Sequence, residues 1–105
     1  MDGFAVYMTE HAINDLDAIC DYISFNLLAP ESAARTGLKI KDAIASLHYM
    51  PERYAVYHEE PWASYKVRFL RVDSYNIFYH VNHADKTVCI IRILYCRQDV
   101  QMHLP

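Results

Sequence analysis

The chain has 105 residues, a net charge of −3 and an apolar fraction of 53%. This length suits a single domain over 1–105, and the apolar fraction is that of a packed globule rather than an unfolded chain. Only two glycines are present, Gly3 and Gly37, which excludes a glycine-rich loop that cradles a phosphate. The acidic balance argues against a protein that coats nucleic acid through bulk charge.

Charge is distributed unevenly along the chain. The first 34 residues contain acidic side chains and no lysine or arginine, whereas residues 35–97 carry all ten cations. We therefore expect one acidic and one basic side. The three cysteines show no CxxC spacing, no signal peptide precedes the domain, and no apolar run reaches the roughly 18 residues of a membrane span. These features predict a soluble, cytoplasmic protein without a membrane partner.

The predicted elements begin with a short strand over 4–8. Thr9 is a suitable N-cap for a helix over about 10–27, in which apolar residues recur at helical spacing. Pro30 suits the first turn of a second helix, which ends by Met50 because a residue before proline disfavours helical geometry. The short link between them makes the two helices an antiparallel hairpin.

Residues 51–64 contain two prolines and no clean period, and predict an irregular loop anchored by its aromatic side chains. Three strands follow, over 65–72, 75–82 and 87–96, joined by short polar turns. The last is apolar on both faces apart from Arg92, which needs an acidic partner if it is buried. The order β-α-α-β-β-β predicts an α+β fold, a helical hairpin packed on a three- to four-stranded, mainly antiparallel sheet that the first strand joins.

Cations gather in the first half of YKVRFLRVDSYNIFYHV, residues 65–81. Lys66 and Arg68 alternate with apolar residues, so the simplest interpretation is the solvated face of a half-buried strand. The alternative is a surface that meets phosphate or another macromolecule. Arg71 breaks the alternation and indicates a bulge or a strand end. The histidines in and after the next strand lack a third ligand, and we expect neither a bound metal nor a cofactor.

The order and spacing of these segments resemble the RelE/ParE superfamily, whose members are toxin components of type II toxin–antitoxin pairs. The resemblance covers about residues 4–104 and rests on NDLDAICDYI, ESAARTGLKIKDAIASLHYMP, YKVRFLRVDSYNIFYHVN and KTVCIIRILYCRQD. It implies a cognate antitoxin that wraps an amphipathic segment along the helical hairpin and the sheet. ParE-like members inhibit DNA gyrase, whereas RelE-like members cleave mRNA in the ribosomal A site without a metal.

The resemblance also implies candidate site residues. On the nuclease pattern, Lys66 and Arg68 match the basic strand positions and Arg97 matches the basic residue after the last strand. His103 falls near the terminal group that transfers a proton. Such cleavage needs cations around the phosphate and groups that exchange protons. The candidate catalytic or target-binding residues, followed by two additional target contacts, are therefore Lys66, Arg68, Arg97, His103, Arg71 and Asp99.

The end of the chain, RILYCRQDVQMHL, is closer to the ParE pattern, in which Arg-x-Asp follows the last strand. Asn76 stands where the nucleases often carry arginine. With the acidic net charge, these features predict a toxin that binds and inhibits DNA gyrase, with contacts from Arg97, Asp99 and the tail. A ribosome-dependent mRNA endoribonuclease is the alternative, and a family member that has lost toxicity or serves assembly alone is a third.

Overall fold

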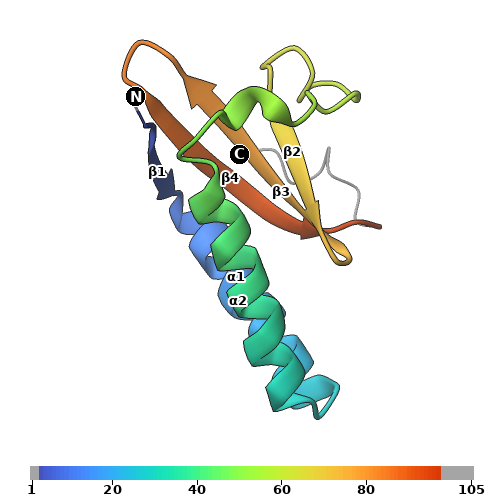
Figure 1. Ribbon diagram of the computed structural model, residues 1–105. Coiled ribbons are helices and arrows are strands. Elements are labelled where there is room, and N and C mark those ends of the chain that lie inside the picture. The colour runs from blue at the N-terminus through green and yellow to red at the C-terminus, as the bar shows by residue number, and fades with distance from the viewer. Residues whose placement is uncertain (1–2, 98–105) are drawn as a thin grey trace.

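The computed structural model describes residues 3–97 of the chain (Figure 1). Strands and helices follow one another in the predicted order, with two short helical turns, η1 and η2, added to it. The bounds are β1 Ala5–Met8, α1 Glu10–Asp21, η1 Tyr22–Asn26, α2 Pro30–Ser46, η2 Pro51–Arg53, β2 Arg68–Val72, β3 Tyr75–Asn82 and β4 Thr87–Tyr95. Within this range no helix is both long and apolar enough to cross a membrane.

One sheet holds all four strands in the order β1-β4-β3-β2 (Figure 1). β2, β3 and β4 form an antiparallel meander, and β1 pairs parallel to β4. β4 is therefore a central strand over its first half, and the layers on the two faces of the sheet account for its apolar residues on both faces. The predicted α+β fold, a helical hairpin on a mainly antiparallel sheet that the first strand joins, is confirmed.

Two clusters of buried residues lie on opposite faces of the sheet. α1 and α2 cover one face, where Leu16, Ile40 and Ile44 pack against strand residues such as Ile77 and Ile90. The loop before β2 covers part of the other face, where the fully buried Trp62 packs with Val67, Phe78 and Leu94. The aromatic anchoring expected of this loop is thus confirmed. The far end of the helical hairpin projects beyond the sheet (Figure 1).

The first helix departs from its predicted form after Asp21. Residues Tyr22–Asn26 form a π-helical turn, in which the N–H of Leu27 donates to the carbonyl oxygen of Tyr22 at 3.2 Å. A π turn contains an extra residue, so the side chains that follow lose the register of the helical stripe. Ile23 stays buried, but Leu27, which the spacing places on the buried stripe, is 56% exposed. The second helix likewise ends at Ser46, before the predicted Met50.

The basic strand is shorter than predicted. β2 begins at Arg68 rather than at 65, because Lys66 lies in a turn with a φ of 60° that a β-strand cannot contain. Of the two alternatives predicted for Arg71, the strand end applies and the bulge does not, because Arg71 pairs regularly with Asn76 and β2 ends at the next residue, Val72. The register shift lies between β3 and β4 and leaves Ile91 as the extra residue of β4.

Candidate functional site

Arg68 is held inside the fold rather than presented to solvent. Its side chain is only 22% exposed, and its guanidinium Nη1 donates to the carbonyl oxygens of Tyr54, at 2.6 Å, and Glu52, at 3.3 Å. Nη2 also lies 3.6 Å from the Glu52 carboxylate. The interpretation as a solvated strand cation is therefore wrong for Arg68, which ties the loop after α2 to β2.

The carboxylate of Glu52 has a second partner, the ring of His83. Its Oε2 lies 2.9 Å from Nε2 of His83, and this hydrogen bond lowers the pKa of Glu52, as does the charge of Arg68. Nearby, the hydroxyl of Tyr79 donates to the carbonyl oxygen of Pro51 at 2.6 Å. Burial raises the pKa of Tyr79 to about 12, against the lowering effect of Arg68. Tyr79 is therefore a structural donor and not a group that exchanges protons at neutral pH.

The other candidate cations within the described residues are exposed. Lys66 lies in the turn before β2, and Arg71 lies near the other end of that strand, where its Nε donates to the carbonyl oxygen of Asp73 at 2.7 Å. Arg97 follows the end of β4. It lies beside the β2–β3 turn, because the preceding residue, Cys96, donates its N–H to a carbonyl oxygen of that turn at 2.8 Å.

The register of the sheet separates these cations into two groups. Arg68 pairs with Tyr79, whereas Tyr75, at the other end of β3, pairs with Tyr95 close to Arg97. Tyr75 and Tyr79 are separated by about 13 Å along β3. The structure thus brings Arg71 and Arg97 to one end of the sheet and leaves Lys66 and Arg68 at the other. Asp99 and His103 lie outside the described residues.

Asn76 occupies the position where the nuclease pattern often has arginine. It is 7% exposed and follows the alternation of β3 onto the face of Phe78, opposite the helices. Its Oδ1 is buried without a hydrogen-bond partner among the described residues. A short neutral side chain at this position supplies no charge to a phosphate.

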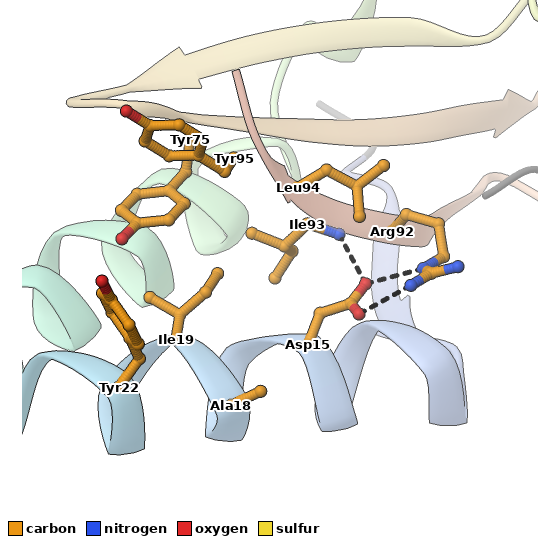
Figure 2. A pocket seen from close by; sticks show the side chains of 9 residues that line it. All are labelled: Asp15, Ala18, Ile19, Tyr22, Tyr75, Arg92, Ile93, Leu94 and Tyr95. Carbon is orange, nitrogen blue, oxygen red and sulfur yellow. Dashed lines mark hydrogen bonds and ion pairs between the residues drawn. The ribbon is translucent and has the colours of Figure 1, made fainter. Parts of the chain in front are cut away.

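Arg92 forms the ion pair that the sequence required, and Asp15 is the partner. Nε and Nη2 of Arg92 lie 2.7 and 2.8 Å from the two carboxylate oxygens of Asp15 (Figure 2). Asp15 also accepts the N–H of Ile93 at 3.0 Å, and the Thr9 hydroxyl donates to the carbonyl oxygen of Ile91 at 2.8 Å. The start of α1 thus covers the edge of β4 beyond the end of β1. The hydrogen bond that Arg92 donates to Asp15 raises the pKa of Arg92.

A pocket of about 550 Å³ lies beside this ion pair, between α1 and β4. Figure 2 shows the rings of Tyr22, Tyr75 and Tyr95 together at the end remote from Asp15. Burial raises the pKa of Tyr75, with smaller contributions from Tyr95 and Tyr22. Sequence reasoning missed this pocket, because its lining comes from elements far apart in the chain and no local pattern marks it.

The family model described as "ParE toxin of type II toxin-antitoxin system, parDE" matches residues 6–100. The chain belongs to this family. A solved chain of the chromosomal ParDE toxin–antitoxin system from P. aeruginosa is 26% identical with a TM-score of 0.71, over 88% of this chain and 95% of that chain. The RelBE2 toxin–antitoxin complex from Mycobacterium tuberculosis shares the fold, at 21% identity and a TM-score of 0.62, over 90% and 93%. Curated proteins gave no match.

The resemblance to the RelE/ParE superfamily is thereby confirmed. Within the described part of this ParE-family toxin, the residues that match the nuclease pattern do not converge. Arg68 is engaged by the loop, and Lys66 and Arg97 lie at opposite ends of the sheet. Across residues 3–97 no group of three or more His, Cys, Asp or Glu side chains is placed to hold a metal ion. Lys66, Arg71 and Arg97 are the candidate cations that are exposed within the described residues.

Proposed function

We propose that this ParE-family toxin arrests growth by binding and inhibiting DNA gyrase, and that a cognate antitoxin neutralises it. The observation that carries the proposal is the placement of the cations. Cleavage of a phosphodiester without a metal needs several charges around one phosphate. The internal engagement of Arg68 and the separation of Lys66 from Arg97 favour a toxin that binds its target over one that performs chemistry.

Arg71 and Arg97 are the proposed contacts to the target, together with Asp99 from the tail. The first two are exposed at one end of the sheet, where the chain continues beyond β4. Arginine is enriched among the residues that dominate protein–protein binding energies, because its planar guanidinium makes several directed hydrogen bonds. Inhibition by binding needs such a surface and no general acid or base.

The first test follows DNA and protein synthesis in bacteria during the earliest minutes after induction of the toxin. Thymidine incorporation is expected to fall before amino-acid incorporation, with a DNA-damage response. Purified toxin is expected to inhibit supercoiling by gyrase and to leave ribosome-bound mRNA intact. If amino-acid incorporation falls first and the mRNA is cleaved, the nuclease alternative holds and the proposal is wrong.

Three variants test which side chains the toxin needs to inhibit gyrase. Arg97→Ala is expected to weaken gyrase inhibition at least about tenfold, as removal of a central arginine contact does elsewhere. Arg35→Ala removes an exposed arginine from α2 and is the matched control. Lys66→Ala is expected to leave gyrase inhibition unchanged. If Lys66→Ala abolishes toxicity while Arg97→Ala does not, the target contacts the end of the sheet that carries Lys66, and the proposed role of Arg97 is wrong.

A further inference from the structure

The pocket between α1 and β4 ends in three tyrosines that come from three different elements (Figure 2). Tyr22 begins η1, Tyr75 begins β3 and Tyr95 ends β4. The ring centroids of Tyr75 and Tyr95 lie 5.9 Å apart at an interplanar angle of 66°, so these two rings form a corner rather than a stack. Figure 2 shows the ring of Tyr22 pointing from the helix toward this corner. The three rings therefore border one end of the pocket from both the helix and the sheet.

The remainder of the pocket offers little to an anion. Between the tyrosines and the ion pair its walls are apolar, with Ile19 on the helix and Ile93 on the strand. Arg92 is the cation that lines the pocket, and it already donates two hydrogen bonds, at 2.7 and 2.8 Å, to the carboxylate of Asp15. A second anion would have to compete with this short, largely buried pair.

The tyrosine end of the pocket suits a positive charge instead. The face of an aromatic ring carries partial negative charge, which attracts a cation placed over it. Burial raises the pKa of the Tyr75 hydroxyl, and acidic groups that include the carboxylate of Asp73 raise it further. The surroundings of this hydroxyl therefore disfavour further negative charge and favour positive charge.

The described chain places its own cations over other rings. Within residues 3–97, Arg53 lies over the ring of Tyr54 and Lys86 lies over that of Phe4. No lysine or arginine of this range lies over Tyr22 or Tyr75 in the same way. The faces of these two rings are thus accessible to a cation that comes from outside this range.

We propose that this pocket binds a small organic cation with apolar substituents, such as an alkylammonium compound. The charged head lies among the rings of Tyr22, Tyr75 and Tyr95, and the apolar part lies along Ile19 and Ile93. Aromatic rings hold quaternary ammonium groups in this way without a carboxylate partner. The volume of about 550 Å³ is that of a small-molecule site.

This binding site is separate from the proposed gyrase contacts in the described chain. Neither Arg71 nor Arg97 lines the pocket. The inference therefore goes beyond the proposed function, and it holds or fails whichever target the toxin has.

A pair of compounds that differ only in charge tests the proposal. Choline carries a trimethylammonium group, and the neutral alcohol with a tert-butyl group in its place has nearly the same shape. The full-length chain, made by cell-free synthesis to avoid its toxicity, is titrated with each compound at constant ionic strength, and the tyrosine ring resonances are followed by NMR. Choline is expected to bind about tenfold more tightly than the alcohol, because the ring faces attract only the cation.

Equal affinities for the two compounds overturn the proposal, since they show an apolar pocket without a preference for charge. Absence of choline binding also overturns it and leaves the pocket to a side chain of a partner protein.

Three variants locate the binding site. Tyr22→Leu removes one exposed ring and is expected to weaken choline binding about fivefold, whereas Tyr22→Phe keeps the aromatic face and is expected to retain most of the affinity. Tyr65→Leu makes the same change at an exposed position before β2, outside the pocket, and is expected to leave the affinity unchanged. Circular dichroism checks that these exposed substitutions preserve the fold. If Tyr22→Leu binds choline as tightly as Tyr65→Leu does, the tyrosines do not hold the cation and the proposal is wrong.

Discussion

The anchor between α1 and β4 is expected to be a major source of stability in this toxin. Asp15→Asn keeps the shape of the side chain but removes the charge that faces Arg92. One carboxylate oxygen becomes an amide nitrogen, which cannot accept the hydrogen bond that the oxygen received. The guanidinium of Arg92, only 16% exposed, then loses the charge of this carboxylate.

The burial and hydrogen bonds of this ion pair determine how much stability Asp15→Asn is expected to cost. The side chains of Arg92 and Asp15 are 16% and 15% exposed, and three hydrogen bonds of 2.7, 2.8 and 3.0 Å end on the carboxylate. Loss of one partner of a buried pair costs about 3–5 kcal/mol. Residual exposure to water places this pair at the lower end, about 3 kcal/mol. For a domain of this size that corresponds to a fall in Tm of about 12–24 °C.

The free energy of unfolding is measured by urea denaturation followed by circular dichroism. Asp42→Asn, the same substitution at an exposed site on α2, is the control and is expected to change it by less than about 0.5 kcal/mol. The double variant Asp15→Leu/Arg92→Met removes both charges and is expected to be more stable than Asp15→Asn, because the guanidinium is removed together with the carboxylate that it faces. Equal small effects of Asp15→Asn and Asp42→Asn would refute the reasoning.

Three further predictions test other parts of the structure. Lys66→Gly is expected to stabilise the chain by about 1 kcal/mol, because a φ of 60° strains any residue with a Cβ; a loss of stability in thermal unfolding would place Lys66 in a strand after all. The lowered pKa of Glu52 means that its contribution to stability is present above the ordinary value of 4.5 and is lost as the pH falls through the lower folded-state value. The difference in Tm between the wild type and Glu52→Gln is therefore expected at neutral pH and to vanish in acid, and a difference independent of pH would contradict this. Trp62→Ala removes a fully buried side chain and is expected to cost about 3–5 kcal/mol in urea denaturation, whereas a cost below about 1 kcal/mol would show that the loop does not pack on the sheet.

Local patterns in the sequence were sufficient to predict the helices and strands and the order in which they follow one another. Thr9 caps α1 as its side chain predicts, with its Oγ1 accepting the N–H of Ala12 at 3.1 Å, and Pro30 begins α2. The alternation in 75–82 and the apolar run in 87–96 correspond to β3 and β4. These features depend on backbone preferences and on periodicity within one segment, which a sequence displays directly.

The candidate site was only partly predictable. The sequence required an acidic partner for Arg92, but several acidic residues qualified and only the packing of α1 against β4 selected Asp15. The alternation around Lys66 and Arg68 predicted two solvated strand cations, whereas the loop that carries Trp62 bends the chain at Lys66 and covers Arg68. Contacts between segments far apart in the chain decide such outcomes, and no local pattern reports them.

By itself the sequence determined the α+β class and the order of the helices and strands, because the periodicity, caps and breaks of each segment are local properties. The tertiary structure decided which charges are available at its surface. Packing placed Arg68 on carbonyl groups of the loop and left Arg71 and Arg97 exposed at one end of the sheet. A charge acts through its distance to other groups and its exposure to water, and both are defined only once the chain has folded.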